Sequence, residues 1–258
     1  QIFQARGDYD TALDTLKKSL LIQQEIGDKS GEGTTLNNIS QIYDARGDYD
    51  TALDTLKKSL LIRQEIGDKS GEGTTLNNIS QIFQARGDYD TALDYLKKSL
   101  LIRQEIGDKS GEGTTLNNIS QIFQARGDYD TALDTLKKSL LIAQEIGDKS
   151  SEGVILNNIS QIYDARGDYD TALDTLKKSL LITQEIGDVA GLCATLFNMG
   201  HIHWKNEKQQ EAVSAWVQVY QLAQPMQLKQ VLDALEGLGL PGGLAGWADL
   251  AQRAATQE

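Results

Sequence analysis

An internal repeat of 40 residues constrains the fold of this chain more than any other feature. Residues 34–73 read TTLNNISQIYDARGDYDTALDTLKKSLLIRQEIGDKSGEG, and nearly the same text recurs from residues 74, 114 and 154. Residues 1–33 match the later part of this segment, and residues 194–224 are a diverged copy. Sequences with periods of this length form stacked units, because one unit cannot bury its apolar face alone. We therefore expect residues 1–224 to form one array of five near-identical copies, of which the first is truncated, and a diverged sixth.

Each copy contains two segments with helical periodicity. Leu36, Ile39 and Tyr43 share one face of the first segment. The second segment carries an apolar stripe formed by Tyr49, Ala52, Leu53, Leu56 and Leu60. One stripe per segment predicts two amphipathic helices that pack together. Both prolines of the chain lie beyond the array, at Pro225 and Pro241, so none interrupts these helices.

The tripeptide Arg-Gly-Asp occurs once per copy, at residues 6–8, 46–48, 86–88, 126–128 and 166–168. This tripeptide is familiar as a cell-adhesion signal, but each of its residues here has a role in a turn between helices. Arg46 complements the dipole at the end of the first helix, Gly47 ends that helix, and Asp48 caps the next one, with Asp50 in its first turn. Gly67 similarly ends the second helix, and Asp68 or Ser70 is available to cap the following one. We interpret the tripeptide as a turn.

Composition limits the partners and the compartment. The chain has 25 Lys and Arg against 37 Asp and Glu, a net charge of −12, and so lacks the positive surface that nucleic-acid binding requires. No apolar run is long enough to span a bilayer, so we expect no membrane partner. The single cysteine, Cys193, excludes an intrachain disulfide and favours a cytoplasmic location. Because the sequence begins at Gln1, within an expected helix, we expect it to be a fragment of a longer protein.

The repeat resembles the tetratricopeptide repeat. Leu36, Ile39, Ser40 and Tyr43, followed by Ala52 and Leu56, follow the pattern of apolar and small residues of that family. The period is 40 rather than about 34 residues, and Gln64 replaces the usual closing proline, so the second helix should continue to Ile66. This longer form is similar to the repeats of kinesin light chain and of Pins-type adaptors.

The resemblance implies an all-α, right-handed superhelical solenoid of helix pairs. Its first helices would line a concave groove that binds an extended peptide or a partner helix, and enzymes are rare in the family. Residues 225–258 would form a C-terminal capping pair, with a helix in 226–240, a turn at 241–243 and a helix in 244–258. The truncated first repeat would expose an apolar end, which allows end-to-end self-association.

A stripe of the first helix, from Thr34 through Asn37 and Gln41 to Asp44 and Ala45, should face this groove by the same resemblance. Amide side chains both donate and accept hydrogen bonds, so a ladder of them can hold a peptide backbone of any sequence. The proposed ladder consists of Asn37, Asn77, Asn117 and Asn157 with Gln81, Gln121 and Gln161. The neighbouring asparagines would either tie adjacent repeats together or also face the groove: Asn38, Asn78, Asn118, Asn158 and Asn198.

The sixth copy changes the chemistry of this stripe. Thr-Thr is already replaced by Val154-Ile155 in the fifth copy, and the sixth has an aromatic, partly cationic patch formed by Phe197, Asn198, His201, Trp204 and Lys205. Buried aromatic residues often supply most of the binding energy of an interface, so this patch would set specificity. Alternatively, Phe197 and Trp204 pack against the C-terminal cap.

No motif for catalysis, metal binding or a cofactor withstands inspection. GDKSGEGTT lacks the Gly-Lys-Ser/Thr ending of a phosphate loop, and a calcium loop starting at Asp68 would have Ile79 where a bidentate Glu is needed. His201 and His203 lie on different helical faces, and Cys193 has no catalytic partners. We therefore expect a non-enzymatic scaffold for protein or peptide partners. Two alternatives remain: a structural spacer or self-stacking segment, and a sensory module of a larger signalling protein.

Overall fold

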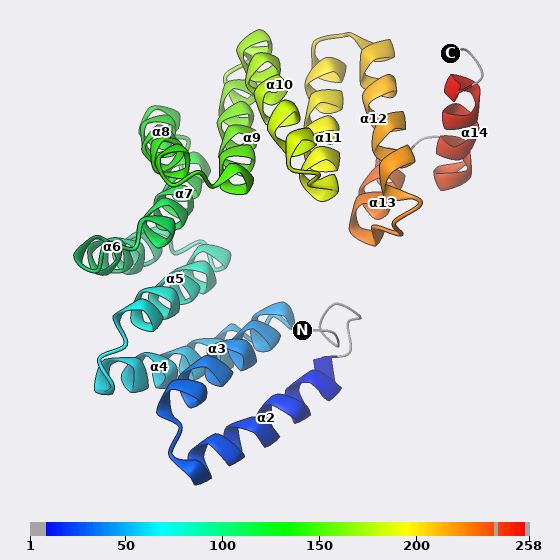
Figure 1. Cartoon of the computed structure of the whole chain (residues 1–258). Helices are drawn as coiled ribbons and strands as arrows, with labels where there is room; N and C mark the ends of the chain where they lie inside the picture. The colour runs from blue at the N-terminus through cyan, green and yellow to red at the C-terminus, as the bar shows by residue number, and fades with distance from the viewer. Residues whose placement is uncertain (1–8, 240–241, 256–258) are drawn as a thin grey trace. The chain divides into compact units, whose positions relative to one another are not determined.

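The structure is a computed structural model that describes residues 9–239 and 242–255. Within these residues, thirteen α-helices follow one another and no strand is formed (Figure 1). The expected all-α array of helix pairs is therefore confirmed. The chain divides into two compact units, Gln1–Asp128 and Tyr129–Glu258, each of which is considered by itself.

The described helices of the first unit are α2 (Tyr9–Ile26), α3 (Lys29–Ala45), α4 (Tyr49–Glu65), α5 (Lys69–Ala85), α6 (Tyr89–Glu105) and α7 (Lys109–Ala125). Those of the second unit are α8 (Tyr129–Glu145), α9 (Lys149–Ala165), α10 (Tyr169–Glu185), α11 (Val189–Lys205), α12 (Gln209–Ala223), α13 (Lys229–Glu236) and α14 (Gly243–Ala255). The odd-numbered helices α3, α5, α7, α9 and α11 are the first helices of their repeats. Each is followed by the second helix of the same repeat.

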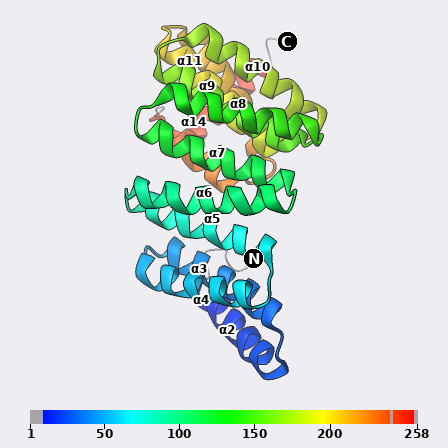
Figure 2. The same cartoon turned by 90° about the vertical axis from the view of Figure 1, so that its left-hand side faces the viewer.

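The core lies between repeats as well as within them. Ala52, Leu53 and Leu56 of α4 are buried against Ile79 and Ile82 of α5, which belong to the next repeat. Figure 2 shows the antiparallel α5 and α6 stacked over α3 and α4 in the first unit. A single repeat therefore leaves part of its apolar surface uncovered, which explains why the copies occur in series.

The predicted helix ends are confirmed at both turns of a repeat. Asp48 accepts a hydrogen bond from the backbone N–H of Thr51, and Asp68 caps α5 by accepting from the N–H of Gly71 at 2.8 Å. Asp68 rather than Ser70 is therefore the cap. Gly47 has a φ of +75° and Gly67 a φ of +68°, a left-handed conformation that favours glycine at the end of a helix.

The arginine of each Arg-Gly-Asp turn has a further role that local reasoning did not predict. Arg46 Nη2 lies 2.6 Å from Asp10 Oδ1 in the preceding repeat, and its guanidinium covers the ring of Tyr9. The same contacts recur between Arg86 and Asp50, Arg126 and Asp90, and Arg166 and Asp130. The tripeptide thus closes one turn and ties two repeats together.

The C-terminal element packs on the sixth repeat. Trp216 of α12, Leu235 of α13 and Trp247 of α14 belong to one buried cluster. The helix expected over 226–240 is found only over Lys229–Glu236, because residues 224–227 form a turn after α12. Leu240, Pro241 and residues 256–258 lie outside the described residues.

Residues 1–8 also lie outside the described part, including Phe3 and Gln4 of the truncated first copy. The end-to-end association expected for this end of the chain stays a prediction.

Candidate functional site

The first helices expose only a narrow stripe, here called the A face. On α3 it consists of Thr34, Asn38, Gln41 and Ala45, with Asp44 half-buried beside it. Other sides of α3 are covered by its own second helix α4, by the preceding α2 and by α5, the next first helix. The four exposed residues are spaced i, i+4, i+7 and i+11, so they lie on one side of α3, the side that these three helices leave uncovered.

The asparagine column predicted to line the groove is mostly turned inward. Asn37 is 7% exposed and its Nδ2 donates to Thr75 Oγ1 of the next repeat at 3.0 Å. Asn157 is 8% exposed and donates to Ser179 and Thr195. Asn37 and Asn157 are therefore more buried than expected, since each first helix packs against the next along this side. A peptide contact by these residues stays a prediction.

The other predicted site residues lie on or near the surface. Five of them are exposed, namely Gln81, Gln161, Val154, Trp204 and Lys205. Six are half-buried, namely Asn77, Asn117, Gln121, Phe197, Asn198 and His201. Asn38, considered for tying repeats together, is exposed on the A face.

A hollow of about 330 Å³, here called the amide pocket, opens on the A face of the first unit. Its walls include Thr34, Asn37, Asn38 and Gln41 of α3, Thr74 and Asn78 of α5, and Arg63 of α4. Asn37 Oδ1, at this pocket, is buried and accepts no hydrogen bond from the described residues. A buried acceptor without a donor is costly, so a ligand N–H at this point would be stabilised.

Arg63 is a functional candidate that the sequence analysis missed. Its side chain is 8% exposed, its Nη1 contacts Asp68, and its Nη2 donates to Thr34 Oγ1 at 2.5 Å. Gly33 leaves room for it, because a Cβ there would lie 2.7 Å from Arg63 Nε. The signal was available: position 63 and its equivalents read Gln23, Arg63, Arg103, Ala143 and Thr183 in copies that otherwise scarcely differ.

The aromatic patch of the sixth repeat is partly structural. Phe197 packs against the cluster that contains Trp216, and its carbonyl accepts from Trp216 Nε1 at 3.2 Å. His201 lies between them, with ring centroids 4.6 Å from Phe197 and 5.4 Å from Trp216. The ring centroids of Trp204 and Trp216 are 5.9 Å apart, but Trp204 remains 50% exposed. Of the aromatic residues predicted here, Trp204 therefore offers the most accessible surface to a partner.

Two polar contacts link this patch to the fifth repeat. Asn198 Nδ2 donates to Asn157 Oδ1 at 3.1 Å, and Lys205 Nζ lies 2.6 Å from Asp164 Oδ2. The cation and the amide of the predicted patch are thus engaged within the protein, which leaves Trp204 as its available anchor.

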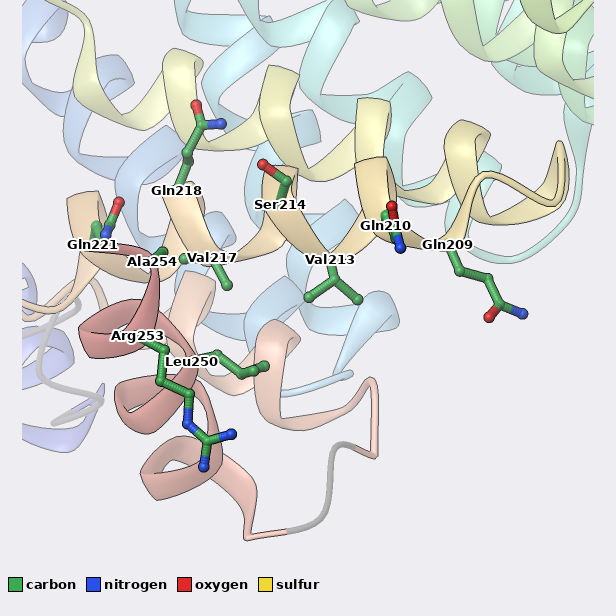
Figure 3. Close-up of a pocket in the computed structure, with 10 residues that line it drawn as sticks. All are labelled: Gln209, Gln210, Val213, Ser214, Val217, Gln218, Gln221, Leu250, Arg253 and Ala254. Atoms are coloured by element: carbon green, nitrogen blue, oxygen red, sulfur yellow. The ribbon is translucent and has the colours of Figure 1, made fainter. Parts of the chain in front are cut away.

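A larger hollow, of about 660 Å³, lies between α12 and α14 (Figure 3). Figure 3 shows Val213 and Val217 of α12 near Leu250 and Arg253 of α14, with glutamines along the rim of α12.

Within the described ranges, no three His, Cys, Asp or Glu side chains are placed to hold a metal ion. Burial raises the pKa of the Cys193 thiol, which disfavours the reactive thiolate. Burial likewise raises the pKa of Asp44 on the A face. None of the helices that the structure describes combines the length and apolarity needed to cross a bilayer.

Solved structures of similar fold include BtubC (BKLC) from P. vanneervenii, with a TM-score of 0.74 and 18% identity over 85% of this chain and 92% of that chain. A putative kinesin light chain from Podosopora anserina, with nearly identical TPR-like repeats, has a TM-score of 0.60 and 16% identity over 75% and 96%. A Rap protein complexed with Competence and Sporulation Factor has a TM-score of 0.69 and 14% identity over 99% and 72%. A search of curated protein sequences finds no match.

The profile of the tetratricopeptide repeat matches residues 1–65, 71–145, 111–185 and 151–224, and so covers nearly the whole array. Apart from Lys69 and Ser70 of α5, these ranges include every helix from α2 to α12. The chain belongs to the tetratricopeptide repeat family.

Proposed function

We propose that this chain is a non-enzymatic scaffold that binds an extended peptide or a partner helix on the A face. The observation that carries the proposal is the amide pocket, which is lined by exposed Asn38 and Gln41, by half-buried Asn78 and by Asn37, whose Oδ1 has no partner among the described residues. Amides that both donate and accept suit the alternating N–H and C=O groups of a peptide backbone. We place this scaffold in the cytoplasm, as the single cysteine favours.

The comparisons support a binding role at a coarser level. Tetratricopeptide repeats generally serve as interaction scaffolds, and a Rap protein of similar fold is complexed with Competence and Sporulation Factor. In this chain Trp204 would add an aromatic anchor in the second unit.

A display screen of random peptides against the chain tests the proposal. The double variant Asn38→Ala, Asn78→Ala removes one exposed and one half-buried amide of the pocket and changes no apolar core residue. We expect it to weaken selected peptides about fivefold or more. Leu61→Ala is the matched control, because Leu61 is 66% exposed on the second helix α4. Trp204→Ala, checked for folding, reports whether the aromatic anchor contributes.

Peptides weakened only by Leu61→Ala would place the site on the second helices and contradict the proposal. The absence of binders, together with concentration-dependent association of the chain, would favour the structural spacer. Binding that appears only when the chain is tested as part of a longer protein would favour the sensory module.

A further inference from the structure

The second unit contains an ion pair of which the first unit has only the acidic partner. Lys205, at the end of α11, binds Asp164, near the end of α9, across two neighbouring first helices. The same two positions of α5 and α3 hold Ala85 and Asp44. The acid is retained in the second repeat, but the cation that faces it is absent from the third.

The helices α3 and α5 have the same lengths and the same type of cap as α9 and α11, so equivalent positions in the two pairs can be compared directly. The helices α3 and α9 both run from a lysine to an alanine over 17 residues, and α5 and α11 also have 17 residues each. All four begin at an aspartate cap that accepts from the third following N–H. An ammonium group placed over Ala85 would therefore meet Asp44 much as Lys205 meets Asp164.

No described residue supplies that cation to Asp44. The arginines that follow α3 and α5 are engaged elsewhere, Arg46 with Asp10 and Arg86 with Asp50. Asp44 is half-buried, and burial alone raises its pKa, which is the shift expected of a carboxylate without a charged neighbour.

A second acceptor on the same helix differs between the two units. Asn157 Oδ1 accepts from Asn198, whereas Asn37 Oδ1 is buried without a donor among the described residues, although Asn78 occupies the position equivalent to Asn198. Asn37 and Asp44 are two helical turns apart, a separation of about 10 Å along α3. Two or three residues of an extended peptide cover that distance.

We propose that the partner of the first unit is a peptide segment that places a Lys or Arg side chain over Ala85, against Asp44, and donates an N–H to Asn37 Oδ1. This inference rests on the proposed function and specifies the charge of its ligand. A cationic segment also complements a chain of net charge −12.

The test uses peptides from the screen, each resynthesised with its Lys and Arg residues replaced one at a time by Gln. We expect one such replacement to weaken binding to the parent chain about tenfold, as loss of a well-placed charge pair does. The same replacement should have little effect on binding to Asp44→Asn.

Two further variants fill the proposed site from within. Ala85→Lys supplies the missing cation and should weaken the peptides about tenfold. Ala125→Lys is its matched control, because it adds the same charge one repeat further on, opposite Gln84 rather than an acid. Peptides in which no Lys or Arg matters, or whose Lys effect persists in Asp44→Asn, overturn the inference.

An NMR titration of the Asp44 carboxyl separates this inference from the proposed function. In Ala85→Lys the pKa of Asp44 should fall relative to the parent, because a neighbouring ammonium favours the carboxylate. Failure of every peptide to bind, with that fall observed, would reject the proposed function but leave the cation site intact. An unchanged pKa would reject the cation site, whatever peptides bind.

Discussion

Single residues in the last turn of the array show what the repeated turns contribute. Asn206, Glu207 and Lys208 replace Arg-Gly-Asp between α11 and α12. Glu207 has a φ of 60°, and Lys208 makes no side-chain cap to α12. This turn therefore has a non-glycine residue in the left-handed region and a helix start without a capping acceptor.

Replacing Glu207 by Gly should stabilise the second unit by about 1 kcal/mol, because glycine adopts a positive φ without steric cost. Thermal or urea unfolding of the two proteins measures the difference. The reverse substitution, Gly167→Glu, is the control: a Cβ at Gly167 would touch nothing within 4 Å, so only its φ of +76° opposes the change. It should destabilise by a similar amount, and an equal stability of both variants would contradict this account.

His203 makes the stability of the sixth repeat sensitive to acid. Burial lowers the pKa of His203 below its usual 6.5, against a smaller opposing effect of Glu211. A group with a depressed folded pKa contributes stability above its unfolded pKa, and that stability is lost as pH falls through the folded pKa. His203→Phe, which restores the residue of Phe83 and Phe123, should reduce this loss below about pH 6.5. Unfolding measured across that range checks it, and an unchanged pH profile would exclude His203 as the cause.

At the scale of helices, the sequence was sufficient for what depends on neighbours in the chain. The two helices per copy, the glycine ends and the aspartate caps at Asp48 and Asp68 are all confirmed. These features depend on residues three or four positions apart. The exposure of Asn37 was predicted wrongly, because the next repeat covers that side of α3. Likewise, the pairing of Arg46 with Asp10 joins residues far apart in sequence, which no local rule anticipates.

The contact between α11 and α12 pairs a smaller residue with a larger one than the same contact in the earlier repeats. In the earlier repeats a serine on the first helix accompanies a leucine on the second, as with Ser40 and Leu56. In the sixth, Gly200 accompanies Trp216, and a Cβ at Gly200 would lie 2.3 Å from Trp216 Nε1. The missing side chain on α11 provides the space for the indole.

This pairing predicts a non-additive double substitution. Gly200→Ser alone should destabilise by about 1–3 kcal/mol through overpacking, and Trp216→Leu alone should destabilise by leaving a cavity. Together they recreate the Ser40 and Leu56 pair, so the double variant should be more stable than the sum of the single effects implies. Denaturant unfolding of all four proteins completes the cycle. Additive effects would show that the two residues do not share one space.

At the scale of the whole molecule, each unit is held together by contacts that recur at fixed sequence offsets. In the first unit Arg86 pairs with Asp50 and Arg126 with Asp90, each across 36 residues. Since the copies are nearly identical, these contacts do not depend on which copy supplies the partner.

Deletion of residues 74–113 should therefore yield a folded chain in which Arg126 pairs with Asp50. We expect a cooperative thermal transition by circular dichroism, at a lower temperature because one repeat interface is lost. Deletion of residues 74–111 is the control, because it leaves two extra residues within the joined helix, which rotate its apolar stripe by about 200° away from its neighbours. Equal stability of the two deletions would contradict the dependence on a fixed offset.

The Arg-Gly-Asp turn thus has a consequence for heredity as well as for folding. An in-frame loss or gain of one copy leaves the contacts between neighbouring repeats intact, since the arginine at the new boundary contacts an equivalent aspartate and tyrosine. The number of repeats can change in a single genetic step while every junction remains one that selection has already accepted. Residues that differ between copies, such as Asp44, Arg63 and Trp204, are then what give each position along the array its own identity.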